Sequence, residues 1–206
     1  LHLSLRRQRQ MCIRDSIIGC GAIAHEVSEI IELNNWDNVR LQCLNAELHN
    51  TPKILPKKIK EAIDSNINDY SKIFLAYADC GTGGLIDLLL KDYDIERLDG
   101  AHCYEFYSGS SVFKELSEKE IGTFYLTDFL VKNFDRLVIE GLGIQKYPSL
   151  KEDYFRNYKN VVYLAQKPDN DLQSKARECA DYLNLEFSVH YTGLKNLENQ
   201  LNEAMK

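Results

Sequence analysis

The stretch KIFLAYADCGTGGLIDLLL, residues 72–90, joins an apolar run to a helical pattern through an acid, a thiol and three glycines. The run at 73–76 predicts a buried strand, and residues 83–90, apolar on almost every side, predict a buried helix. Glycine frees backbone N–H groups to approach a ligand, whereas aspartate and cysteine bind metals or carry chemistry. The stretch therefore predicts a strand, a turn and a helix with a site at the turn.

The same alternation of strand and helix extends along the chain in both directions. Helical spacing of apolar residues follows the first strand, a second helix is predicted to begin near Pro56, and residues 122–134 read as an aromatic-rich helix with Thr123 as its N-cap. Two further helices are predicted around residues 172–183 and 194–205. IIGCGA at residues 17–22 is predicted to be the end of a strand and a turn, and further strands are predicted at residues 39–44, 72–78, 95–101, 135–144, 159–166 and 185–193.

This order predicts an α/β fold with a mostly parallel, Rossmann-like sheet and helices on both faces. We expect residues 17–206 to form a single α/β domain. Cys20-Gly21 and Cys80-Gly81 lie 60 residues apart, as do Cys43 and Cys103, so two loosely similar βαβα halves are an alternative to coincidence. Residues 1–16 lack apolar periodicity and resemble translated sequencing-adaptor read-through; a native basic, disordered tail is the other interpretation.

Composition excludes several classes of protein. The net charge is −6 and the pI is about 5.4, which disfavours a nucleic-acid surface. No apolar run reaches the ~20 residues of a transmembrane helix, and no signal-peptide core appears, so we expect no membrane contact and a cytoplasmic location. The six cysteines form no CxxC pair, so reduced thiols are expected. Cys43 and Cys179 are expected to be structural.

Polar residues follow four consecutive predicted strands, where a parallel sheet gathers its carboxyl ends at one edge. Scattered core residues would have no reason to occupy the same point of each unit. We therefore expect one active rim. Its members are Cys20 after the first strand, Glu47, His49 and Asn50 after the second, Asp79 and Cys80 after the third, and His102, Cys103 and Glu105 after the fourth.

Sulfur and imidazole groups suit zinc or another divalent metal of borderline softness, and long separations between them suit a catalytic site more than a structural finger. The alternative is core cysteines and satisfied histidines. A third reading makes Cys80 or Cys103 a nucleophile paired with His102. The predicted metal ligands are Cys20, His49, Cys80, His102 and Cys103, and the predicted catalytic residues are Cys80, His102, Asp79 and Glu105.

The glycine-rich turn predicts a nest of amides for a small anionic ligand, formed by Gly81, Thr82, Gly83 and Gly84. A turn that merely needs positive φ is the alternative. The motif GCGAIAHE at residues 19–26 lacks a clean dinucleotide fingerprint, so a tight turn is favoured over nicotinamide binding. Asp128, an acid among aromatic residues, is a candidate partner of a histidine or a solvated helix position.

Six motifs in order resemble the uncharacterised family catalogued as domain of unknown function 1638, from Ile17 to about Gly193. The resemblance implies a setting of corrinoid-linked methyl transfer. We thus expect a metal-dependent enzyme or accessory factor that acts on a small anionic or one-carbon-bearing substrate. A non-enzymatic module that binds a corrinoid, a pterin or a methyl-transfer partner protein is the alternative. The motifs are IIGCGAIAHEV, ELHNTP, YADCGTGGLID, GAHCYEFYSG, GTFYLTDFLVKNF and VYLAQ.

Overall fold

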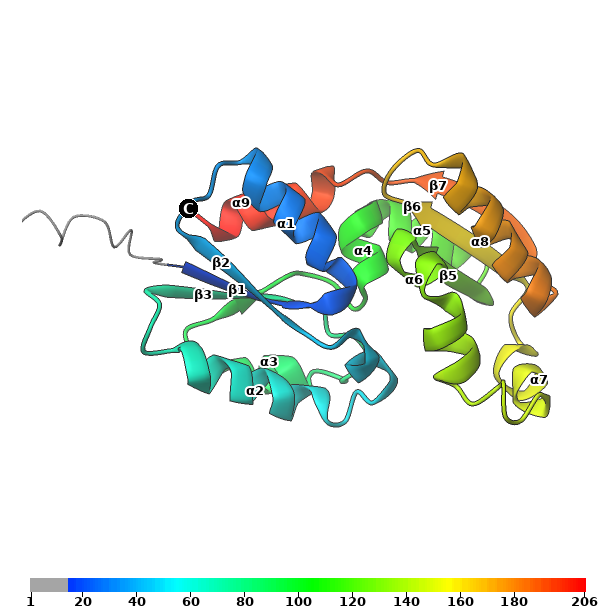
Figure 1. Ribbon diagram of the computed structural model, residues 1–206, viewed down its shortest axis with the longest axis horizontal. Coiled ribbons are helices and arrows are strands. Elements are labelled where there is room, and N and C mark those ends of the chain that lie inside the picture. Colours follow the sequence, from blue (N-terminus) through cyan, green and yellow to red (C-terminus); the bar gives the residue numbers. More distant parts are fainter. Residues whose placement is uncertain (1–14) are drawn as a thin grey trace, which may run out of the picture.

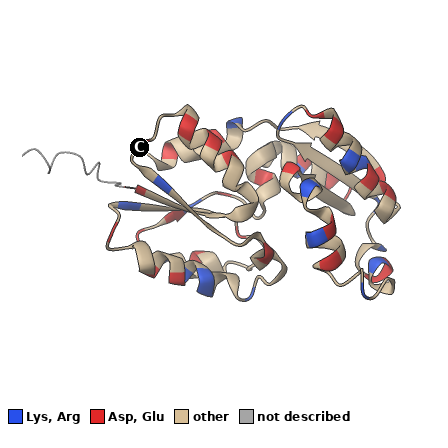
Figure 2. Cartoon of the chain, in the orientation of Figure 1, with Lys and Arg blue, Asp and Glu red and all other residues tan. Residues whose placement is uncertain are grey.

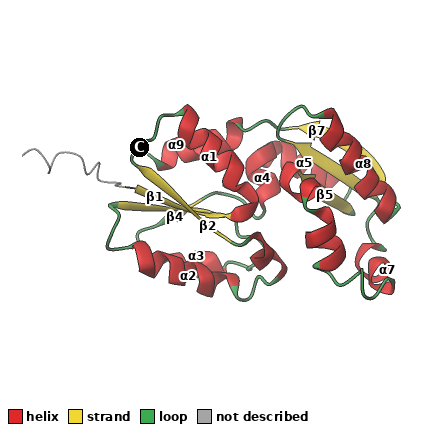
Figure 3. Cartoon of the chain, in the orientation of Figure 1, coloured by secondary structure: helices red, strands yellow, loops and turns green. Residues whose placement is uncertain are grey.

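The computed structural model describes residues 15–206, which form two parallel sheets flanked by helices (Figure 1). The first sheet has the order β2-β1-β3-β4 and the second the order β5-β6-β7, and every pairing in both is parallel. Figure 3 shows helices on both sides of the strands. The predicted α/β class with a Rossmann-like arrangement is confirmed, although the strands are divided between two sheets.

The first sheet has a core on both faces. Figure 1 shows α1 and α9 on one side of it and α2 and α3 on the other. Ile17 and Ile18, neighbours that point to opposite faces, are both fully buried. The strands are β1 (Asp15–Cys20), β2 (Val39–Leu44), β3 (Lys72–Ala76) and β4 (Glu96–Arg97). The helices are η1 (Gly21–Ile23), α1 (Ala24–Leu33), η2 (Ala46–Asn50), α2 (Leu55–Asn66), α3 (Leu85–Leu90) and α9 (Lys195–Ala204).

Several helix predictions match in detail, and two strand expectations change. Pro56 stands in the first turn of α2, as predicted, and Ile59 and Ile63 bury its apolar face. Strand β1 begins at Asp15, which pairs with Val39, two residues before the predicted start. Residues 1–14, most of the predicted leader, lie outside the described residues. Cys43, expected to be a structural residue inside a strand, does lie in β2 but is exposed, because β2 is an edge strand.

The second sheet is also covered on both faces. In β6, Val161, Tyr163 and Ala165 face a core formed with α8, while Val162 and Leu164 face Tyr125 and residues of α4 and α5. This alternation is the period of two expected of a strand. The strands are β5 (Thr123–Thr127), β6 (Asn160–Ala165) and β7 (Glu186–Tyr191). The helices are α4 (Cys103–Ser108), α5 (Ser110–Lys119), α6 (Asp128–Lys132), η3 (Asp135–Glu140), α7 (Ser149–Phe155) and α8 (Asn170–Leu183).

The predictions for residues 122–144 are wrong in part. The predicted helix is half strand, because the β-branched and aromatic run 123–127 forms β5. Thr127, rather than Thr123, caps α6: its hydroxyl accepts a hydrogen bond from the Leu130 N–H at 3.3 Å. The predicted strand at 135–144 is instead a π-helical turn, whose Val138 packs into the second core.

Helix α3 is less buried than its composition predicts, since Leu85 and Leu88 are exposed. The last helix returns to the first sheet after the chain has built the second (Figure 1). Leu197 and Leu201 of α9 are fully buried in the first core, and α9 also contacts α4. Figure 2 shows acidic and basic residues interspersed along outer helices such as α2 and α8.

Candidate functional site at the junction of the two sheets

Four loops at the carboxyl ends of the first sheet carry the cysteine and histidine residues selected from the sequence. Cys20 ends β1, His49 lies in η2 after β2, Cys80 follows β3, and Cys103 begins α4 after β4. The strands run parallel, so these loops lie at the same edge of the sheet. Cys20 and Cys80 are buried, with 4% and 5% of their surfaces exposed.

Cys20 and His49 are in contact. The Cys20 Sγ lies 4.0 Å from the His49 Nδ1, and the Ala22 N–H donates to the same sulfur at 3.4 Å. Burial lowers the pKa of His49, and the nearby His102 lowers it further. His49 therefore presents a neutral imidazole at neutral pH, which is the form that binds metals.

Cys80 is held close to the segment that leads into Cys103. The Asp79 N–H donates to the Gly100 carbonyl at 3.1 Å, and the Cys80 N–H donates to the Ala101 carbonyl at 2.9 Å. These bonds continue the pairing of β3 with β4 beyond the strands themselves. Cys80 adopts a φ of 51°, a left-handed conformation that is uncommon for a residue other than glycine.

The three thiols influence one another's ionisation. Burial raises the pKa of Cys80 to about 12, with a further contribution from the charge of Cys20. Burial raises the pKa of Cys103 well above its ordinary value, and the charges of Cys80 and Cys20 add to that shift. Burial also raises the pKa of Cys20. The three thiols are therefore protonated at neutral pH in the free protein.

A cavity of about 210 Å³ opens beside Cys103 and His49. Its walls come both from loops of the first sheet and from segments around β5 of the second sheet. His49 and Cys103 line it with an imidazole and a thiol, and Asn50 and Thr127 with an amide and a hydroxyl. The wall formed by segments around β5 was not predicted from the sequence, because residues 122–134 were expected to be one helix and residues 135–144 a strand. The remaining lining residues are Ala22, Ala46, Tyr104, Phe124, Phe129, Leu130, Leu137, Val138 and Leu142.

The glycine-rich turn binds its own aspartate. The Asp79 carboxylate accepts hydrogen bonds from the Thr82 hydroxyl at 2.6 Å, the Gly83 N–H at 2.9 Å and the Gly84 N–H at 2.8 Å. These bonds and Arg97 hold the pKa of Asp79 below its usual value, although partial burial opposes them. An external anion would have to displace this carboxylate. The anion site at Gly81–Gly84 stays a prediction.

His102 and Glu105 occupy the start of α4. His102 is exposed, and its ring lies 6.1 Å from that of Tyr104. The Glu105 carboxylate accepts a hydrogen bond from the Ala101 N–H at 2.9 Å, so it stabilises the turn that presents Cys103. Catalytic roles for His102, Glu105 and Asp79 stay predictions.

Asp128 lies in a buried network of the second half. Its carboxylate accepts hydrogen bonds from the Tyr163 hydroxyl at 2.7 Å and the Gln166 N–H at 3.0 Å. Its own N–H donates to the Gln166 side chain at 2.8 Å. No hydrogen bond joins Asp128 to a histidine among residues 15–206; the network instead fixes the start of α6.

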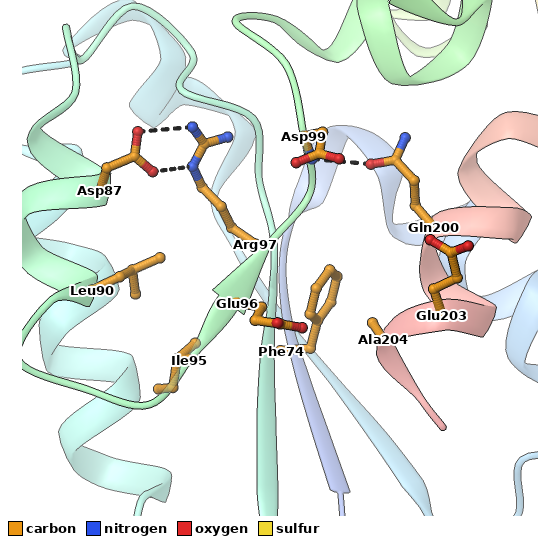
Figure 4. A pocket seen from close by; sticks show the side chains of 10 residues that line it. All are labelled: Phe74, Asp87, Leu90, Ile95, Glu96, Arg97, Asp99, Gln200, Glu203 and Ala204. Carbon is orange, nitrogen blue, oxygen red and sulfur yellow. Dashed lines mark hydrogen bonds and ion pairs between the residues drawn. The ribbon is translucent and has the colours of Figure 1, made fainter.

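A larger hollow of about 570 Å³ lies at the β4 edge of the first sheet (Figure 4). Arg97 spans it, with its Nε and Nη2 donating to the Asp87 carboxylate at 2.5 and 2.9 Å. The Asp99 N–H donates to Gln200 of α9 at 3.0 Å. These contacts tie α3, β4 and α9 together, and none of the thiols lines this hollow.

The thiol cluster, which we define as Cys20, His49, Cys80 and Cys103, does not form a closed coordination shell. Within residues 15–206, no three His, Cys, Asp or Glu side chains are arranged to hold a metal ion. Among these donors in the described part of the chain, Cys20 and His49 form the one direct pair. The donor types nevertheless fit zinc, because thiolate and imidazole are its commonest ligands.

Comparison with known proteins identifies one similarity. The family model described as "Protein of unknown function (DUF1638)" matches residues 43–201. No curated protein and no solved structure is significantly similar to the chain. Across the described part of the chain, none of the helices has the length and apolar character needed to traverse a bilayer.

Proposed function

The chain belongs to the DUF1638 family, whose description states no activity, and we propose from its site that it is a metal-dependent protein that acts on a small substrate. The observation that carries the proposal is the contact of Cys20 with His49 beside a cavity that His49 and Cys103 line, with Cys80 at the same edge of the sheet. Zinc is the first candidate, because it prefers sulfur and nitrogen donors.

The residues proposed to hold the ion are Cys20, His49, Cys80 and Cys103. In the free protein the thiols keep their protons, since burial raises their pKa values. A bound cation would replace those protons, which is the usual coupling of metal binding to thiol ionisation. Cys80 and Cys103 would turn toward the Cys20–His49 pair to complete the shell. When bound, zinc supplies Lewis-acid chemistry and can activate a thiol.

The cavity supports a small substrate with an apolar part. Its volume of about 210 Å³ is below the roughly 300–1,000 Å³ typical of pockets for drug-sized ligands. Among the described residues that line it, none is Lys or Arg, so its walls favour a one-carbon-bearing group over a free anion. We propose methyl-group metabolism as the setting, because the resemblance described under the sequence analysis implies it; the cavity does not bear on this point.

Metal content tests this proposal directly. Protein purified without chelators is expected to contain zinc or another thiophilic metal, as measured by elemental analysis. Cys80→Ser and Cys103→Ser should each lower the metal content or the affinity by at least about tenfold, because oxygen is a poor substitute for thiolate. Cys179→Ser is the matched control, since Cys179 is a buried thiol of α8 in the other core. Wild-type protein that neither contains nor takes up metal would contradict the proposal.

A second candidate is a binding module without turnover. The position of the cavity at the junction of the two halves favours it, because ligand sites often lie there. A corrinoid macrocycle exceeds this cavity, so such a ligand requires the halves to separate, whereas a pterin requires less opening. Stoichiometric binding without turnover supports the module.

The cysteine-nucleophile alternative is less well supported. Burial raises the pKa values of Cys80 and Cys103 and outweighs the backbone hydrogen bonds that lower them, and His102 is exposed. If Cys80→Ser keeps full metal and loses only turnover, this alternative gains.

A further inference from the structure

The first sheet ends in an open edge at β4. Within residues 15–206 this strand pairs only with β3, and its Arg97 stands opposite Leu75. The Leu98 N–H donates to the Leu75 carbonyl at 3.1 Å, so Leu98 directs its backbone groups to β3. Backbone groups alternate along a strand, and Arg97 therefore directs its N–H and its carbonyl to the open side. An edge of this kind is a template for a further strand.

Two helices flank this edge and leave a hollow between them, which we call the β4 groove. It measures about 570 Å³ and is bounded by α3, β4 and α9 (Figure 4). Leu90 of α3 and Ala204 of α9, both buried, give it apolar walls. At one end, the Gln200 side-chain oxygen accepts a hydrogen bond from the Asp99 N–H at 3.0 Å. Gln200 thus takes the place that the carbonyl of a neighbouring strand would take.

The two sides of the β4 groove differ in charge. Arg97 donates to the Asp87 carboxylate, so the α3 side holds a neutral ion pair. Glu96 is the register partner of Phe74, and Figure 4 shows both on the α9 side, where Glu203 also lies. Glu96 and Glu203 are exposed, and neither forms an ion pair with another described residue. The groove therefore has an acidic side and a neutral, largely apolar side.

We propose that the β4 groove binds an extended segment of a partner protein, which adds to the first sheet as a fifth strand and alternates basic with apolar side chains. Successive side chains of a strand point to opposite faces. The basic ones meet Glu96 and Glu203 on the α9 side, and the apolar ones meet Leu90 on the α3 side. Hydrogen bonds to the Arg97 backbone supply affinity, and the charges fix the register. None of the thiols lines this groove, so the proposal is independent of the metal site.

A second copy of this chain is a poorer occupant. Two copies that join their β4 edges do so about a two-fold axis perpendicular to the sheet, which keeps both α9 helices on the same face. The acidic side of one groove then meets the acidic side of the other. Like charges brought opposite each other are destabilising, whereas a basic segment meets opposite charge.

The test uses a short synthetic peptide of alternating lysine and valine, blocked at both ends and labelled with a fluorophore. Fluorescence anisotropy should show saturable binding to the wild type that weakens as salt is added. The double variant Glu96→Gln/Glu203→Gln should bind about threefold more weakly or worse, because two exposed contacts between opposite charges are lost. Glu152→Gln, at an exposed acid of α7 outside the groove, should bind like the wild type.

Methylation of the peptide nitrogens tests the backbone pairing. In a strand, the lysine amides point to one edge and the valine amides to the other, so methylation of one set should abolish binding and methylation of the other should preserve it. Equal binding of the two methylated peptides, equal binding by the double variant and the wild type, or no binding of the unmodified peptide would each overturn the proposal. A wild-type dimer in light scattering that the peptide fails to dissociate would assign the edge to a second copy, which also overturns it.

Discussion

Cys80 combines burial, a left-handed backbone and a raised thiol pKa, and the glycines that follow share its unusual conformation. Gly81, Gly83 and Gly84 have φ values of 79°, 66° and 84°. A Cβ on any of the three would meet no atom within 4 Å, so conformation rather than space requires glycine there. The sequence interpretation of a turn with positive φ is confirmed. Its companion, an open amide nest, meets the carboxylate of Asp79 instead.

Replacing Gly84 tests whether its left-handed backbone conformation is what requires glycine at this position. Gly84→Ala should lower the free energy of unfolding by about 1–2 kcal/mol, the usual cost of a left-handed conformation for a residue with a Cβ. Gly84→Asn should cost less, because asparagine tolerates that region better. Urea denaturation of both variants measures the difference. Equal stability of wild type and Gly84→Ala would show that the turn relaxes to negative φ.

At the scale of elements, an ion pair joins the β4 edge of the first sheet to α3. Arg97, largely buried, bonds the exposed Asp87 of α3, and this hydrogen bond holds the pKa of Asp87 below its ordinary value of 3.8. A carboxyl whose pKa is lowered by folding contributes stability above its unfolded pKa. That contribution is lost as pH falls through the lower folded value.

Asp87→Asn should therefore destabilise the protein at neutral pH by less than about 1 kcal/mol, since the carboxylate is exposed to solvent. The difference from wild type should shrink below about pH 4 and vanish in stronger acid, where the wild-type carboxyl is protonated. Chemical denaturation across that pH range provides the measurement. A difference that persists unchanged in acid would mean that shape, rather than charge, explains the effect.

For the whole molecule, pattern alone predicts the class and most elements but not the division into two sheets. The two elements assigned the wrong type both lie at residues 122–144, where apolar residues fit a helix and a strand equally well and only tertiary packing decides. Cys20, His49, Cys80 and Cys103 could be found because each follows a strand. The cavity wall that segments around β5 form depends on how the two sheets pack against each other, which no local sequence pattern predicts.

The path of the chain predicts how the two sheets, each with its own core, unfold. The chain leaves the first sheet after β4, builds the second, and returns as α9, whose Leu201 is fully buried in the first core. Val161 is fully buried in the second core. Because α9 closes the first core only after the second sheet has been made, we expect one cooperative transition for both.

Leu201→Ala should lower the free energy of unfolding by about 2–5 kcal/mol, the usual cost of truncating a buried leucine. The fluorescence of Trp36, the single tryptophan, reports the first core, whereas far-UV circular dichroism reports both halves. In Leu201→Ala and Val161→Ala alike, the two signals should shift together. A shift of circular dichroism in Val161→Ala, with the Trp36 transition unmoved, would show that the second sheet unfolds independently. The cavity between the sheets could then open without unfolding the thiol cluster, which would favour the binding of larger ligands.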